Sequence, residues 1–226
     1  MPSYWLGTDN MGRDLLSRLI QGARVSLIVS VVGVLLAGIV GVSVGMIAGY
    51  LGGKVDNIIM RIVDIWMSIP PILLIIILSD VLGGGLQTII VGILSGFWVI
   101  YARVIRIEVS SLRQRDFITM ARITGGSSFK ILVRHIFPNV FNTVLVLATL
   151  QLGTAIMMEA GITFLGLGIQ PPNVAWGLLI AEGRIYMDTA WWIPTFAGIA
   201  VMISVLGSNL MGDWLRDKLD PRLRQL

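Results

Sequence analysis

The longest uncharged stretch of the sequence constrains the fold more than any other feature. From residue 25 to residue 53 the chain has no charged side chain and consists mostly of apolar residues and glycine. About 20 apolar residues are enough for a helix to cross a bilayer. In lipid, backbone polar groups must pair within the protein, which leaves helices or closed barrels. The stretch is too long for a barrel strand and lacks alternation, so it predicts a membrane-spanning helix.

Four similar apolar runs follow the first one. We predict five spans, at about residues 25–51, 58–80, 82–104, 137–159 and 190–212. The composition agrees, because 55% of the residues are hydrophobic and only 13% are charged. Such a balance is typical of a polytopic membrane protein and not of a soluble domain. The expected fold class is therefore all-α, with residues 1–226 forming one bundle of membrane helices.

The basic residues divide unevenly between the segments that join these spans. Of the 17 lysines and arginines, 13 fall on one side of the predicted membrane and four on the other. Cytoplasmic segments carry the excess of Lys and Arg in membrane proteins. We therefore expect the loop at 105–136 and the C-terminus to be cytoplasmic, and the loop at 160–188 to be external. Because the charge is confined to short segments between apolar runs, nucleic acid is not an expected partner.

Catalytic and metal-binding motifs are absent from the sequence. There is no cysteine and one histidine, His135, so neither a zinc-binding His-Glu-x-x-His helix nor a cysteine cluster can form. No phosphate-binding loop of the GxxxxGK[ST] kind occurs. The 11 methionines suit flexible packing better than soft metal ligation. We expect the chain to be no enzyme and to bind no metal or cofactor.

Small residues recur at every fourth position along the first predicted span. Such a ridge lets a neighbouring helix approach closely, although membrane helices are also glycine-rich in general. The ridge consists of Gly33, Ala37, Gly41, Gly45 and Gly49. It predicts a packed interface, within the bundle or with another subunit. Residues 12–22, just before the span, predict a short amphipathic helix in the outer interface; a plain juxtamembrane end of the spanning helix is the alternative.

Few residues suggest where a transported molecule would pass. Pro70 and Pro71 interrupt the second span, and a broken helix at mid-membrane often lines a pathway; a tolerated kink is the alternative. Asp80 and Glu159 lie at the outer ends of spans, where a carboxylate could meet an amine or a cation. Interfacial charge without such a role is the alternative for both. Met157 completes the predicted pathway set, and Arg61 is expected to pair locally with Asp64.

The segment "RQRDFITMARITGGSSFKILVRHIFPN", residues 113–139, is a polar and basic interruption in this apolar chain. Asp116 suits the start of a short helix, and Gly125 with Gly126 suits its end. Ser127 or Ser128 can cap a second short helix, which leads through Pro138 into the next span. The apolar side chains of these helices need a partner, either lipid headgroups or another protein.

This segment resembles the signature loop of binding-protein-dependent ABC importer permeases. Thr119, Met120 and Ala121 stand where the family pattern has Glu-Ala-Ala, Gly125 stands at its glycine, and Pro138 stands at its closing proline. Thr and Met depart from the pattern at its first two letters. "LGTDNMGRDLLSRLIQGARVSL" (6–27) and "FLGLGIQPPNVAWGLLIAEGR" (164–184) are similar to the peptide/nickel branch of that family. The resemblance covers essentially the whole chain.

The resemblance implies a fold, a function and a set of partners. The fold is that of type I ABC importer permeases, which usually have six spans, so we expect a five-span form lacking the first. The implied partners are a sister permease in a heterodimer, two cytoplasmic ATPases that bind ATP and Mg²⁺, an extracytoplasmic solute-binding protein and membrane lipid. The implied location is the plasma (inner) membrane of a prokaryote. Peptides are the expected cargo, with nickel or glutathione as alternatives.

The resemblance also assigns roles to particular residues. The first short helix of the segment would seat in a groove of an ATPase. The residues expected to couple the chain to the ATPase are Asp116, Thr119, Met120, Ala121, Arg122, Gly125, Gly126, Ser127 and Pro138. Those expected to face the binding protein are Phe164, Gly166, Gly168, Pro171, Pro172, Trp176 and Gly177. A secondary transporter or channel remains a competing class, but it predicts paired intramembrane charges or an internal repeat, and neither is found.

Overall fold

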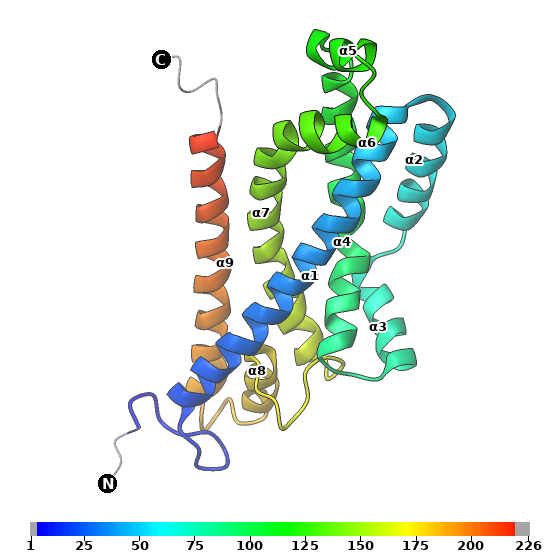
Figure 1. The fold of residues 1–226 in the computed structure, drawn as a ribbon. Coiled ribbons are helices and arrows are strands. Elements are labelled where there is room, and N and C mark those ends of the chain that lie inside the picture. The colour runs from blue at the N-terminus through cyan, green and yellow to red at the C-terminus, as the bar shows by residue number, and fades with distance from the viewer. Residues whose placement is uncertain (1–3, 220–226) are drawn as a thin grey trace.

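The computed structural model describes residues 4–219, which form helices and connecting loops without a strand. Figure 1 shows long helices running between two ends of a bundle. We name these ends after the short helices found there, the α5 end and the α8 end. The helices are α1 (Leu15–Leu51), α2 (Gly53–Met67), α3 (Pro71–Leu82), α4 (Leu86–Leu112), α5 (Asp116–Ile123), α6 (Ser128–Ile131), the π-helix η1 (Leu132–Ile136), α7 (Phe137–Phe164), α8 (Trp176–Arg184) and α9 (Trp192–Leu219).

The long helices confirm the predicted all-α membrane bundle. Among residues 4–219, four segments are long and apolar enough to cross a membrane: α1, α4, α9 and the continuous stretch Ser128–Phe164 that ends in α7. A fifth span is possible if α2 and α3 count as one, although they are bent by 80°. The five predicted ranges overlap these helices in order. α1, α4, α7 and α9 each extend beyond one end of their predicted range, because helices continue past the apolar core into the interface, whereas α4 and α9 begin four and two residues later than predicted.

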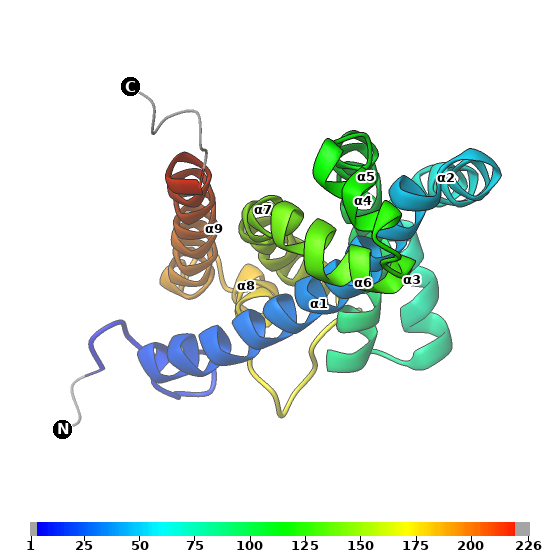
Figure 2. The same ribbon diagram turned by 45° about the horizontal axis from the view of Figure 1, so that its top comes forward.

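Residues 15–22 are helical as predicted, but they form the start of the spanning helix, which was the alternative. α1 begins at Leu15, where the Asp14 carboxylate accepts a hydrogen bond from the backbone N–H of Ser17 (2.9 Å), and it runs unbroken to Leu51 (Figure 2). Leu15 and Leu19 of the apolar stripe are buried in a cluster with α8 and α9, whereas Ile20 is 64% exposed. The packing of Leu15 and Leu19 against protein replaces the expected placement of this stripe in the membrane interface.

The ridge of small residues on α1 packs against α4. A Cβ atom at Gly45 would lie 2.6 Å from the carbonyl oxygen of Ala102, and one at Gly49 would lie 2.7 Å from that of Arg106. At Gly33 it would lie 2.8 Å from the side chain of Ile93, and at Gly41 it would collide with the backbone of Trp98. Ala37, within the ridge, is completely buried. The two helices therefore touch backbone to backbone, an approach that larger residues would prevent.

The break at Pro70 divides a predicted span into two helices with separate attachments. Pro71 opens α3, where its missing N–H costs no helix hydrogen bond. α3 packs on α4 through Ile75, whose side chain occupies the space that a Cβ at Gly92 would need. α2 is held to α4 by ion pairs of Asp64 with Arg103 and of Asp56 with Arg106.

The ion pair at Asp64 corrects a prediction. We expected Asp64 to pair with Arg61, three residues earlier, because such spacing places two side chains on one face of a helix. In the structure Asp64 pairs with Arg103 of α4. A contact across two packed helices replaces the local one, since Asp64 lies on the side of α2 that meets α4.

Candidate functional site

The helix predicted at residues 116–124 exists and is capped as its sequence suggests. α5 begins at Asp116, whose negative charge lies in the first turn, and its last turn carries Arg122. A negative charge in the first turn and a positive charge in the last turn both interact favourably with the helix dipole. At its end the N–H of Gly126 donates to the carbonyl of Ala121 (3.0 Å) and the N–H of Gly125 donates to that of Arg122 (3.0 Å). These two bonds form a Schellman motif.

Both glycines of this turn are needed, for different reasons. Gly125 has φ 81°, a left-handed conformation that costs a residue with a Cβ about 1–2 kcal/mol. Gly126 lies so close to α5 that a Cβ would come 2.6 Å from the carbonyl oxygen of Ala121. The chain therefore reverses within two residues and starts α6 at once, with the Ser127 hydroxyl accepting from the N–H of Lys130 (3.3 Å).

A π-helical turn, which we did not predict, joins α6 to α7. It spans Leu132–Ile136 and ends just before Pro138 in the first turn of α7. In a regular helix the proline ring would clash with the carbonyl four residues earlier, that of Arg134. The wider π turn gives this carbonyl room. A π turn of this length leaves no recognisable hydrophobic pattern in the sequence. Pro138 was therefore the one sequence feature that pointed to an irregular turn here.

One side of α5 is anchored to the bundle. Ile118 is completely buried and belongs to the main core together with Ile131 and Ile136. Arg122 lies over the ring of Tyr50, 4.7 Å from its centroid, and its Nε donates to the Tyr50 hydroxyl (3.3 Å). Tyr50 is near the end of α1, so α5 is fastened to that end of the longest helix.

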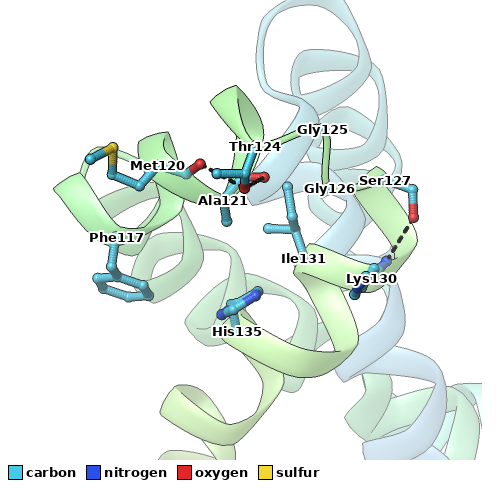
Figure 3. Close-up of a pocket in the computed structure, with 10 residues that line it drawn as sticks. All are labelled: Phe117, Met120, Ala121, Thr124, Gly125, Gly126, Ser127, Lys130, Ile131 and His135. Atoms are coloured by element: carbon cyan, nitrogen blue, oxygen red, sulfur yellow. Dashed lines mark hydrogen bonds between the residues drawn. The ribbon is translucent and has the colours of Figure 1, made fainter.

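The other side of α5 is apolar and open. Phe117, Met120 and Ile123 are 41%, 63% and 75% exposed. Beside them lies a hollow of about 490 Å³, enclosed between α5 and the α6–η1 segment. Figure 3 shows Phe117 and Met120 reaching from α5, with Lys130 and His135 on the opposite segment. Its lining consists of Phe117, Met120, Ala121, Thr124, Gly125, Gly126, Ser127, Lys130, Ile131 and His135. A protruding apolar helix beside a hollow is a shape that suits a protein partner.

The remaining residues predicted for this segment are solvent-accessible. Asp116 and Thr119 are exposed, and the Thr119 hydroxyl approaches the backbone carbonyl of Arg115 at 3.5 Å. Pro138 is exposed at the start of α7. The structure thus brings the nine predicted residues of the segment together at the α5 end.

The loop after α7, residues 165–175, folds back onto the bundle at the α8 end. Gly166 has φ 82°. A Cβ at Gly168 would lie 2.8 Å from the Cα of Thr163, and one at Gly177 would lie 2.8 Å from the Cα of Ala160. Trp176 is buried, and its indole N–H donates to the carbonyl of Leu19 (3.0 Å).

The other residues predicted for this outer region lie at its surface. Pro171 and Pro172 are exposed, and the ring of Phe164 lies under the Arg184 guanidinium at 5.0 Å. The prolines and Gly166 are therefore exposed and Phe164 is half-buried, while Gly168, Trp176 and Gly177 serve close packing.

The residues predicted for a pathway do not share one surface. Pro70, Pro71 and Asp80 are exposed. Met157 is 59% exposed, whereas Glu159, two residues later on α7, is completely buried. Two positions on a helix differ by about 200° in direction. Glu159 therefore faces into this chain and has no surface that cargo can touch in this structure.

The α8 end contains an ion-pair network that we did not predict from the sequence. Arg18 is buried, and its Nη1 donates to Asp9 (2.7 Å) and to Glu182 (2.7 Å). Arg13 also donates to Asp9, through Nε at 2.6 Å. Burial by itself raises the pKa of Asp9, but hydrogen bonds from Arg13, Met11 and Arg18 bring that pKa below its usual value. Arg18 and Glu182 are far apart in sequence, so no local pattern could reveal the pair.

Comparison with known proteins agrees with this architecture. The family described as "Binding-protein-dependent transport system inner membrane component" matches residues 41–225. The di/tripeptide transport system permease protein DppC of Pseudomonas aeruginosa is 39% identical over 98% of this chain and 73% of its own. The nickel transport system permease protein NikC of Escherichia coli is 42% identical over 97% of this chain and 79% of its own.

A solved structure shares the fold. A chain of the MetNI methionine ABC transporter, in an inward facing conformation, superposes with a TM-score of 0.71 at 20% identity. The match covers 89% of the present chain and 96% of that one. The resemblance inferred from the three sequence motifs is confirmed by these matches. The chain belongs to the binding-protein-dependent transport system inner membrane component family, as a multi-pass permease subunit of the peptide, nickel and glutathione group of ABC importers and not as an enzyme.

Proposed function

We propose that this permease imports peptides and that α5 couples it to a cytoplasmic ATPase. Two ATPase subunits would bind and hydrolyse ATP with Mg²⁺, and a sister permease would supply the other half of the pathway. A solute-binding protein would deliver cargo at the α8 end. The α5 end would then be cytoplasmic, together with the C-terminus, in agreement with the bias of Lys and Arg.

One observation carries the coupling proposal. α5 exposes Phe117, Met120 and Ile123 on one side while Ile118 and Arg122 fasten its other side to the bundle. An apolar helix that protrudes from a fixed base can enter a groove of a partner. Because the base is joined to α1 through Tyr50, a movement of the partner would reach the spanning helices without loss in a flexible linker.

A matched pair of isoleucines tests this proposal. Ile123 at the α5 end and Ile185 at the α8 end are 75% and 76% exposed. Burial of an isoleucine in an interface is worth about 2 kcal/mol, and a glutamate there also loses hydration. We expect Ile123→Glu to weaken binding of the ATPases at least about 30-fold, and Ile185→Glu to leave it unchanged.

The measurement is copurification of the ATPases with the complete transporter in mild detergent, followed by binding-protein-stimulated ATP hydrolysis. Both variants should reach the membrane in equal amounts, since both side chains are exposed. Equal loss of the ATPases from the two variants, or retention in both, would contradict the assignment of α5.

The proposal that peptides are the cargo is supported by the sequence similarity of this chain to permeases of peptide and glutathione systems. The relatives named above belong to a di/tripeptide and a nickel system, and glutathione, the third cargo of the group, is itself a peptide. Competition decides between them: uptake of a labelled dipeptide in cells with the complete transporter is measured against excess glutathione and against Ni²⁺. Inhibition by Ni²⁺ alone would favour the nickel alternative.

A further inference from the structure

Both ends of the loop at residues 165–175 are bound through backbone N–H groups to hydroxyl groups of two different helices. The N–H of Ile169 donates to the Thr163 hydroxyl of α7 (3.2 Å). The N–H of Trp176, just after the loop, donates to the Ser26 hydroxyl of α1 (3.4 Å). In Figure 1 this loop lies at the α8 end, below the helices that supply the two hydroxyls.

One carboxyl group lies beside the Thr163 hydroxyl. The Thr163 hydroxyl donates to Oε1 of Glu159 at 2.9 Å. It accepts from the N–H of Ile169 and therefore has its own proton left to donate. A chain of hydrogen bonds thus runs from Ile169 through Thr163 to Glu159, while Oε2 of the same carboxyl group is buried without a hydrogen-bond partner within residues 4–219.

The carboxyl group has no other evident task in this chain. Glu159 is completely buried, and it takes part in none of the ion pairs found within residues 4–219. On the helices packed against α7, Arg18 is bound to Asp9 and Glu182, Arg24 is exposed, and Arg184 lies over Phe164. An isolated charge is costly in such surroundings. Glu159 therefore contributes to the structure through its hydrogen bond with Thr163 and not through an ion pair.

Glycines let the loop close over this group. Gly168 lies against the backbone of Thr163, and Gly177 lies against that of Ala160, each so close that a Cβ would be 2.8 Å from a Cα. The loop backbone therefore covers the last turn of α7 directly. Because the loop backbone touches α7 directly, the loop cannot shift closer to the helix to compensate when the hydrogen bond of Glu159 is weakened.

We propose that Glu159 is a positioning residue that fixes the start of the loop at 165–175 through Thr163, and that it does not touch cargo. The hydrogen-bonding part of this proposal stands on the geometry alone. Its consequence for transport rests on the proposed function, in which this loop faces the solute-binding protein.

Hydrogen exchange of the complete transporter tests the proposal directly. In Glu159→Gln the amide can still accept from Thr163, so exchange in residues 165–176 and its dependence on pH should match the wild type. In Glu159→Leu this bond is lost. The net value of one hydrogen bond is about 1 kcal/mol, so we expect exchange around Ile169 to accelerate about fivefold, with residues 4–14 as the internal control.

Thr163→Val provides a second variant that keeps the side-chain volume if Glu159→Leu fails to fold. We expect faster exchange around Ile169 and a smaller effect at Trp176. Unchanged exchange in both variants would overturn the positioning role. Loss of transport in Glu159→Gln with normal exchange would instead show that the carboxylate touches cargo or a cation, which also overturns the proposal.

The two proposals fail in different ways. If the ATPases do not bind at α5 but exchange responds as expected, only the proposed function fails. If the ATPases bind and transport is peptide-dependent but exchange does not respond, only the role of Glu159 fails. Binding-protein-stimulated transport, measured on the same samples, should be normal in Glu159→Gln and reduced in Thr163→Val.

Discussion

The contact between α1 and α4 predicts a large and local effect of adding one methyl group. A Cβ at Gly45 would lie 2.6 Å from the carbonyl oxygen of Ala102 and 3.1 Å from the backbone nitrogen of Arg106. Both neighbours are backbone atoms of a packed helix, so neither can rotate away. Overpacking of this kind costs about 1–3 kcal/mol.

An equivalent substitution in open space provides the control. Gly198 of α9 has nothing within 4 Å of the position a Cβ would take. There alanine restores helix propensity and gains about 1 kcal/mol relative to glycine. Because Gly45 also lies inside a helix, both variants gain this propensity, and the difference between Gly45→Ala and Gly198→Ala should be the overpacking cost of about 1–3 kcal/mol, with Gly45→Ala the less stable.

Thermal unfolding in detergent measures this difference. A chain of this length changes its Tm by about 2–4 °C per kcal/mol, which puts the two variants roughly 6 °C apart. Gly161→Ala, another position with open space, should behave like Gly198→Ala. Equal Tm values for Gly45→Ala and Gly198→Ala would refute the conclusion that α1 and α4 touch backbone to backbone.

Three further predictions concern the two ends of the bundle. Arg18→Met removes one of the two arginines that bind the buried Asp9, together with the partner of Glu182, and should cost about 2–3 kcal/mol; a Tm equal to that of the wild type would contradict the network. Because the pKa of Asp9 is lowered on folding, its contribution is present above the unfolded pKa of about 3.9 and is lost as pH falls further. Asp9→Asn should therefore flatten the loss of Tm below about pH 4. Gly125→Ala should destabilise the turn after α5 by about 1–2 kcal/mol, which limited proteolysis would detect as faster cleavage between α5 and α6. The control is Gly53→Ala, at φ 56° in open space, which should cost the same amount at the α1–α2 turn and leave the cleavage rate near α5 unchanged.

The sequence predicted well wherever the cause of a structure is local. The charge of Asp116, the glycines at 125 and 126 and the Ser127 cap placed two short helices that the structure contains. The four-residue spacing of small residues on α1 indicated close helix packing, and it left the partner open because spacing says nothing about what lies opposite. The structure supplies α4 as that partner.

The predictions that failed depended on contacts across the bundle. Asp64 pairs with Arg103 and not with its neighbour Arg61, and Arg18 reaches Glu182 of α8. Glu159 was one of the residues considered for a pathway, with an interfacial charge that has no such role as the alternative, and the structure buries it completely. Side-chain direction across packed helices is set by their relative rotation, which no single helix encodes.

The unbroken course of α1 gives the proposed coupling a physical route. A helix of 37 residues is about 55 Å long, which exceeds the apolar thickness of a bilayer of about 30 Å. At one end Tyr50 holds Arg122 of α5. At the other end Arg18 binds Glu182 and the carbonyl of Leu19 accepts from Trp176, so that α1 is fixed to α8. If α1 were interrupted near residue 24, a displacement of α5 would be absorbed at the joint. As one rod, packed along α4 on its ridge of small residues, α1 links the surface proposed for the ATPase to the loop that Glu159 positions.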